Sequence, residues 1–284
     1  MNTTSTARGM LNDTRERTLW LDLPVAVRDA VERETGTVQA VDPVRSGLNA
    51  GFTAIVHASS TSVFVKGMPT EHRRIATQQR EAAVADRIAG IGPVLRWQFE
   101  AGGWNILGFD HLRGHHADLG PGSADLGKLA DVLTRLGQLP APGLPLARIE
   151  RRWAGYADQR ELAVLAGDRL LHTDLNPHNI LITTSGAKIV DWAWPTLGAA
   201  WVDPACAALW LIAEGHSPAA AENWAAAIPA WREAPATGID VFTTVNRNLW
   251  EQIADNDPQP WKDKLHQAAQ AWNEYRLRLH RSDS

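Results

Sequence analysis

The stretch that decides the fold is HTDLNPHNILI at residues 172–182, which is followed by IVD at residues 189–191. It places Asp174 on a loop, Asn179 five residues later at the start of a short apolar run, and Asp191 at the end of the next such run. Polar residues at the ends of neighbouring short strands converge on one point, which residues spaced along a helix do not. The pattern therefore predicts one site built from these three side chains.

The residue types in this pattern suit chemistry on phosphate groups. Transfer of a phosphoryl group needs a carboxylate that orients the attacking hydroxyl, and oxygen ligands for hard cations. Carboxylate and amide oxygens favour Mg²⁺, whereas Zn²⁺ more often binds Cys or several His. The competing interpretation is that Asp174, Asn179 and Asp191 are ordinary turn residues, since Asp and Asn are favoured in loops. Their joint spacing favours the site, with Mg²⁺ as its metal.

The pattern His172-x-Asp174-x-x-x-x-Asn179 resembles the catalytic loop of the aminoglycoside phosphotransferase and choline kinase-like family, the small-molecule relatives of protein kinases. The resemblance covers about residues 45–215. It implies transfer of the γ-phosphate of ATP or GTP to a hydroxyl of a small molecule. It also implies that Asp174 is the catalytic base or hydroxyl-orienting residue, that Asn179 and Asp191 hold Mg²⁺, and that His172 braces the loop.

Two upstream features agree with this resemblance. Lys66 ends a strand-like run, and Glu81 follows 15 residues later on a helical run, as an ion pair that orients the triphosphate would require. For each residue alone, a solvated surface position is the competing interpretation. Gly47 and Asn49 lie in a small-residue loop whose backbone N–H groups are expected to cover the phosphates. These four residues are the predicted nucleotide-binding set.

Departures from the protein kinase pattern bear on which kind of kinase the sequence predicts. Thr173 stands where protein kinases have Arg, Trp192-Ala193 follows Asp191 in place of Phe-Gly, and the chain has neither a full Gly-x-Gly-x-x-Gly loop nor an Ala-Pro-Glu segment. Protein kinase activity is therefore disfavoured. Without that Arg, a phosphorylated loop loses its usual charge partner, so the sequence predicts a constitutively assembled site.

Asp203 resembles the Asp with which the family ties the metal-binding segment to the catalytic loop. A loop-bracing role is the implied one. The residue could equally be only the N-cap of a helix that begins near Pro204, because Asp followed by Pro is a common helix start.

Hydrophobic periodicity gives the fold class. β-branched and aromatic runs precede and follow one long helical run at 71–88, and helical patterns dominate after about residue 123. The chain is predicted to be α+β with a two-lobed, protein kinase-like fold. The N-terminal nucleotide-binding lobe, residues 1–110, would hold a small antiparallel sheet with one long helix. The larger, mainly helical C-terminal lobe, residues 111–284, would hold the catalytic loop and the substrate site.

Composition excludes several classes of partner. The 284 residues carry a formal net charge of −4, which argues against a nucleic-acid partner. We expect no membrane association, because no apolar run is long enough to span a bilayer and the first residues lack an apolar export signal. The only cysteine, Cys206, lies in an apolar run and fits a reducing compartment. The expected location is cytoplasmic.

The charge of the C-terminal part bears on the acceptor. Residues 214–263 hold eight acidic and three basic side chains, a local excess of five negative charges. In the family that the chain resembles, the acceptor lies between the catalytic loop and C-terminal helices, so an acidic wall there would favour a cationic acceptor. A merely solvated acidic surface explains the same count.

A competing function is a nucleotide-binding regulatory or scaffold protein without turnover. The joint presence of Lys66, Glu81, Asp174, Asn179 and Asp191 argues against it, because a binding module has no need of Asp174. The sequence thus favours a magnesium-dependent small-molecule kinase.

Overall fold

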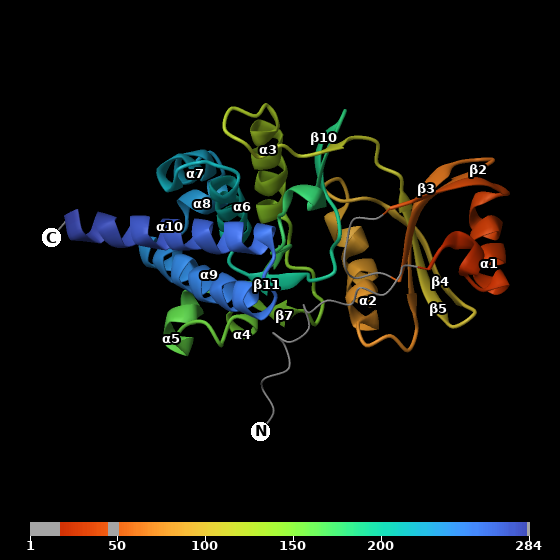
Figure 1. Cartoon of the computed structure of the whole chain (residues 1–284), viewed down its shortest axis with the longest axis horizontal. Helices are drawn as coiled ribbons and strands as arrows, with labels where there is room; N and C mark the ends of the chain where they lie inside the picture. Colours follow the sequence, from red (N-terminus) through yellow and green to blue (C-terminus); the bar gives the residue numbers. More distant parts are fainter. Residues whose placement is uncertain (1–17, 45–50, 283–284) are drawn as a thin grey trace, which may run out of the picture. The chain divides into compact units, whose positions relative to one another are not determined.

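The computed structural model describes residues 18–44 and 51–282 and divides into two compact units (Figure 1). Among the described residues, the sheet unit contains 18–115 and 181–194, and the helical unit contains 116–180 and 195–282. The segment 181–194 thus joins the N-terminal part, which a single boundary along the sequence does not anticipate. That residues 1–110 bind the nucleotide and residues 111–284 bind the acceptor stays a prediction.

The sheet unit is built around a five-stranded antiparallel sheet of order β1-β2-β3-β5-β4. The elements of its N-terminal part are η2 (Trp20–Asp22), α1 (Val25–Thr35), β1 (Val38–Pro43), β2 (Phe52–Ala58), β3 (Ser62–Pro69), α2 (Ile75–Val84), η3 (Ala85–Ile88), β4 (Leu95–Ala101) and β5 (Trp104–Asp110). Alternating side chains of the central strands, such as Val63 and Val65, pack in one core with Val27 and Val31 of α1. The residues between them on each strand face the opposite way.

The long helical run is shorter than the sequence pattern predicts. The helix expected over residues 71–88 begins at Ile75, and its last turn tightens into the 3₁₀ segment η3. Residues before Ile75 are used for a turn, in which His72 donates its backbone N–H to the carbonyl of Pro69. Gly90, with φ of 85°, lies just beyond the end of the 3₁₀ segment.

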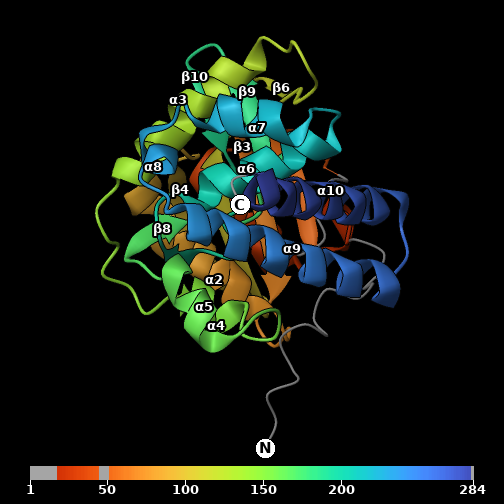
Figure 2. The same ribbon diagram turned by 90° about the vertical axis from the view of Figure 1, so that its left-hand side faces the viewer.

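Most of the helices belong to the helical unit. Its elements are α3 (Asp125–Gln138), β7 (Ala147–Arg148), α4 (Ile149–Arg152), α5 (Gln159–Leu162), η4 (Ala163–Leu165), β8 (Arg169–Leu171), η5 (Pro177–Asn179), β11 (Thr196–Gly198), α6 (Val202–Ala213), α7 (Pro218–Ala225), α8 (Pro229–Arg232), α9 (Ala236–Asn256) and α10 (Pro260–Ser282). The two longest helices, α9 and α10, lie side by side (Figures 1 and 2). Phe242 on α9 packs against Trp153, Trp201 and Trp272, with ring centroids 5.7, 6.3 and 5.7 Å away. Large aromatic surfaces therefore supply much of this core.

Two small sheets complete the fold. In the helical unit, β7, β11 and β8 form one sheet, whose strand β8 leads directly into the loop that contains Asp174. The other sheet has the order β10-β9-β6, and its strands are β6 (His115–His116), β9 (Ile180–Thr183) and β10 (Gly186–Ile189). The division between the units runs through β6 and β9. Strand β10 leads to Asp191.

None of the helices in the described part of the chain is long and apolar enough to cross a membrane.

Candidate active site

Lys66 lies at the centre of a buried charge cluster in the sheet unit. Its Nζ is 2.7 Å from Oε2 of Glu81 and 2.7 Å from Oδ1 of Asp191. The sequence pattern placed Lys66 at the end of its strand. In the structure β3 continues to Pro69, so Lys66 lies within the strand. Since Val63 and Val65 face the α1 core, Lys66 points to the opposite face, where α2 supplies Glu81.

The cluster holds two carboxylates and one ammonium in a nearly dry environment. The side chains of Lys66 and Glu81 are 10% and 6% exposed. Burial alone would lower the pKa of Lys66, but the charges of Asp191 and Glu81 raise it above its ordinary value. Burial raises the pKa of Glu81, and the charge of Lys66 opposes that shift. One ammonium therefore keeps two carboxylates in place, and the sequence pattern anticipated only the partner on α2.

Asp191 is fixed by its own segment as well as by Lys66. Its backbone has φ of 62°, in the left-handed region that residues other than glycine seldom adopt. The next residue, Trp192, is buried, donates its ring N–H to the carbonyl of Ile189 at 2.9 Å, and donates its backbone N–H to Glu81. The unusual backbone thus has a surrounding structure that holds it.

The loop after β8 presents Asp174 at the surface of the helical unit. Asn176 donates from Nδ2 to Oδ1 of Asp174 at 3.0 Å, and Asn179 donates from Nδ2 to Oδ2 at 3.0 Å. Asn179 also reaches the backbone carbonyl of Asp174 at 2.9 Å. Two amides therefore fix the direction of an exposed carboxylate. The sequence interpretation did not include Asn176, although an Asn two residues after an Asp is a recognisable loop signal.

Asp203 holds the backbone that precedes Asp174. Its carboxylate, which is buried, accepts the backbone N–H of His172 at Oδ2 and that of Thr173 at Oδ1, both at 2.8 Å. Burial raises the pKa of Asp203, and these two N–H donors oppose the shift. Helix α6 begins at Val202, with Trp201 as its N-cap residue, so the N-cap interpretation of Asp203 is wrong.

His172 is buried at the start of the loop. Its Nδ1 accepts the backbone N–H of Asp174 at 3.2 Å. The ring therefore lies inside the loop's hydrogen-bond network, where a bracing residue would be.

Each unit contains a residue whose oxygen atoms suit a hard cation. Asn179 uses its amide nitrogen on Asp174, which leaves the amide oxygen as the atom suited to Mg²⁺. Asp191 supplies carboxylate oxygens. Among the described residues there is no group of three or more His, Cys, Asp or Glu that could hold a metal ion. Amide and carboxylate oxygens are ligand types that Mg²⁺ prefers, so each residue by itself has a suitable donor atom. Gly47 and Asn49 lie outside the described residues.

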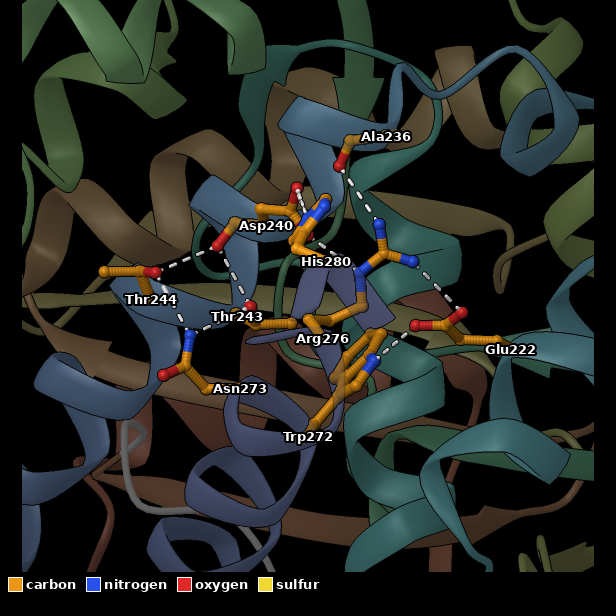
Figure 3. A network of polar contacts seen from close by, with 9 residues as sticks. All are labelled: Glu222, Ala236, Asp240, Thr243, Thr244, Trp272, Asn273, Arg276 and His280. Carbon is orange, nitrogen blue, oxygen red and sulfur yellow. Dashed lines mark hydrogen bonds and ion pairs between the residues drawn. The ribbon is translucent and has the colours of Figure 1, made fainter. Parts of the chain in front are cut away.

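Four of the eight acidic side chains of residues 214–263 form ion pairs with basic side chains. Arg276 on α10 contacts Oδ1 of Asp240 at 2.8 Å and Oε2 of Glu222 at 3.4 Å (Figure 3). Glu214 pairs with Lys264, and Asp257 pairs with Lys262. The basic residues Lys264 and Arg276 lie just beyond the counted window, which is why the local charge count missed them. The remaining acids of the window, Glu233, Glu251, Asp255 and Asp263, are exposed.

Comparison with known proteins finds a family model that matches part of the chain. Residues 162–236 match the model of the phosphotransferase enzyme family. The matched segment contains His172, Asp174, Asn179, Asp191 and Asp203. No curated protein sequence matches the chain.

Three solved structures share the fold at low sequence identity. A choline kinase from Streptococcus pneumoniae has a TM-score of 0.60 and 13% identity, covering 88% of this chain and 98% of that one. A microcompartment-associated aminopropanol kinase has a TM-score of 0.58 and 14% identity, covering 90% and 98%. A thermostable mutant of an aminoglycoside phosphotransferase, in ternary complex with ADP and hygromycin B, has a TM-score of 0.56 and 10% identity, covering 86% and 98%.

These likenesses confirm the α+β, kinase-like fold class. The loop motif lies inside the segment that matches the model of the phosphotransferase enzyme family, and the chain shares its fold with a choline kinase and an aminoglycoside phosphotransferase.

Proposed function

We propose that this protein transfers the γ-phosphoryl group of ATP or GTP to a hydroxyl of a small molecule. The observation that carries the proposal is Asp174, an exposed carboxylate whose two oxygens are directed by Asn176 and Asn179 within the segment that matches the phosphotransferase family. In phosphoryl transfer the protein mainly positions the reactants and neutralises charge. A carboxylate held in a fixed direction at the surface suits the first of these tasks.

Each part of the site has a role in this reaction. Asp174 orients the acceptor hydroxyl towards the γ-phosphorus and takes its proton as the new O–P bond forms. Lys66, held by Glu81, contacts the α- and β-phosphates. Asn179 and Asp191 hold Mg²⁺, which when bound neutralises charge on the phosphates. Because Lys66 already contacts Asp191, a metal on that carboxylate would share it with the ammonium or release the ammonium to the phosphates.

The competing function is nucleotide binding without turnover. A binding protein would need Lys66, Glu81 and Asp191, but it gains nothing from a carboxylate fixed by two amides at the surface. The two functions are separated by incubating the protein with ATP or GTP, Mg²⁺ and a panel of hydroxyl compounds. Appearance of a phosphorylated acceptor in the mass spectrum supports the kinase. Saturable nucleotide binding with no phosphorylated product from any class of acceptor supports the binding protein.

Replacement of Asp191 by Asn should weaken magnesium-dependent nucleotide binding. The change removes a charged oxygen ligand, and losses at metal sites are commonly about tenfold or more. Calorimetric titration with ATP, with and without Mg²⁺, measures the effect. Asp86→Asn, at an exposed acid of η3, is the control and should bind as the wild type does. An unchanged response to Mg²⁺ in the Asp191 variant would remove this residue from the metal site.

We further propose an amine-bearing acceptor. The solved neighbours include a choline kinase, an aminopropanol kinase and an aminoglycoside phosphotransferase bound to hygromycin B, all named for amine-bearing compounds. The ion pairs of Glu222 and Asp240 reduce the negative charge available to attract such a compound, so the exposed acids of residues 214–263 carry this expectation.

The acceptor proposal predicts a dependence on salt. If exposed acids attract a cationic acceptor, its KM should rise with ionic strength, because charges are screened over about 8 Å at physiological salt. Neutralising Glu233, Glu251, Asp255 and Asp263 together should raise the same KM while leaving that of the nucleotide unchanged. A matched neutral alcohol serves as the control acceptor. The proposal would be contradicted if the neutral compound were turned over better and the KM for the amine did not change with ionic strength.

A further inference from the structure

Thr173, between His172 and Asp174, has a backbone conformation that its side chain disfavours. Its φ is 65°, in the left-handed region where β-branched residues are rare. Glycine would adopt the same conformation freely. A strained backbone next to a reactive side chain persists only where the surrounding contacts hold it.

Two groups hold Thr173 from different sides. Asp203 accepts its backbone N–H at 2.8 Å. Arg152, the last residue of α4, donates from Nη1 to the Thr173 hydroxyl at 2.8 Å, and the same nitrogen donates to the hydroxyl of Thr196 on β11. Thr196 is fully buried, so this anchor is fixed in the core of the helical unit. The positive charge of Arg152 also favours the ionised form of Asp203.

We infer that Arg152 is a positioning residue of the transferase site, which acts on Asp174 through the hydroxyl of Thr173. This inference rests on the proposed phosphotransfer. Asn176 and Asn179 fix the direction of the Asp174 carboxylate, and Arg152 and Asp203 fix the backbone that carries it. The loop has Thr where protein kinases have Arg, and the guanidinium reaches the same loop from α4 instead.

The contact explains why threonine is tolerated at a position that suits glycine. Without a use for the hydroxyl, Thr173 would cost conformational energy and contribute nothing to the loop. With Arg152 bound to it, the hydroxyl ties the loop to α4 and β11. Removing either partner should therefore loosen the placement of Asp174 without changing the reactive groups themselves.

The test uses four variants of the full chain, which are Arg152→Met, Thr173→Gly, Thr173→Ser and the double variant of Arg152→Met with Thr173→Gly. Small displacements of a reactive group cost about a hundredfold in rate, so Arg152→Met and Thr173→Gly should each lower kcat by about ten- to a hundredfold. The KM for the nucleotide should change little, because neither residue belongs to the set proposed to bind it. Thr173→Ser keeps the hydroxyl and should retain turnover close to the wild type. The double variant should be no slower than the slower single variant.

Two further measurements separate positioning from simple loss of structure. Thr173→Gly relieves backbone strain, which offsets part of the entropy that glycine adds to the unfolded chain, so its melting temperature should fall little compared with the loss in kcat. Arg151→Met, at the exposed neighbouring arginine of α4, is the matched control and should behave as the wild type. Hydrogen exchange of the amides of residues 172–176 should be faster in Arg152→Met than in the wild type or in Arg151→Met.

Three results would overturn the inference. These are wild-type kcat in Arg152→Met, multiplicative effects in the double variant, or unchanged amide protection of the loop in Arg152→Met. If the wild type transfers no phosphate to any acceptor, the proposed function fails, and the exchange measurement alone still decides whether Arg152 holds the loop.

Discussion

Replacement of Asp174 by Ala is expected to lower kcat by about 10²- to 10⁴-fold, the usual contribution of a positioned general base. The affinity for the nucleotide should be nearly unchanged, because the lost carboxylate acts on the acceptor hydroxyl. Asp174 is exposed, and in the variant the buried amide of Asn179 keeps the backbone carbonyl of residue 174 as an acceptor, so the fold should tolerate the change. Steady-state kinetics with the best acceptor, together with nucleotide titration, measure both quantities.

Asp168→Ala is the control for that variant. Asp168 is an exposed acid just before β8, and its side chain lies 3.9 Å from Arg169. Its loss should leave kcat unchanged. Turnover of Asp174→Ala at the rate of this control would remove Asp174 from the reaction, and parallel losses of kcat and nucleotide affinity would indicate a structural role instead.

Replacement of Lys66 by Met should lower both activity and stability. The change leaves Glu81 buried without its ammonium and removes the ion pair of the half-buried Asp191, and breaking a buried ion pair commonly costs about 3–5 kcal/mol. Glu81→Gln should slow transfer as well, because Lys66 then loses its orientation. The double variant should be much less than multiplicatively worse, since both changes disrupt one pair. Urea unfolding measures the stability, and steady-state kinetics measure the activity, of the two single variants and the double variant. Together with the wild type they complete a double-mutant cycle.

The stability of Lys66→Met should also depend on pH. Burial raises the pKa of Glu81 in the folded state above its ordinary value of 4.5, and without Lys66 the backbone N–H of Trp192 is left to oppose that shift. An acid whose folded pKa is raised gives stability that is present below the unfolded pKa and lost as pH rises through the folded pKa. The free energy of unfolding of Lys66→Met should therefore be lower at pH 8 than at pH 5, relative to the wild type.

Lys128→Met provides the comparison for the lysine variant. Lys128 on α3 is 44% exposed and pairs loosely with Asp125 at 3.5 Å, so its loss should cost less than about 1 kcal/mol at either pH. Two results would contradict the proposed ion pair. These are independent effects of Lys66→Met and Glu81→Gln, or a loss in the free energy of unfolding of Lys66→Met that is the same at pH 5 and pH 8.

The loop of residues 172–179 could be predicted from the sequence because its polar residues lie close together along the chain. His172, Asp174 and Asn179 share one loop, and local spacing determines which side chains can meet there. The Lys66 and Glu81 pair could be anticipated from a strand followed by a helix. Their contact at 2.7 Å is a property of the fold, and their roles towards a nucleotide stay predictions.

Contacts between distant segments could not be read from local patterns. Lys66 and Asp191 are 125 residues apart in sequence, and Arg152 and Thr196 are 44 apart. Arg276 neutralises Asp240 from a different helix, which a charge count over one segment cannot show. Such pairings depend on how helices and strands pack, so the contacts of Arg152 and the ion pairs within residues 214–276 emerged only from the structure.

The central claim is that the γ-phosphoryl group leaves the nucleotide for an acceptor hydroxyl. The most direct measurement quantifies nucleoside diphosphate, phosphorylated acceptor and inorganic phosphate together in one reaction with Mg²⁺. The account predicts one phosphorylated acceptor for each nucleoside diphosphate formed, with transfer lost in Asp174→Ala. Nucleoside diphosphate matched only by inorganic phosphate, or equal transfer by Asp174→Ala and the wild type, would contradict it.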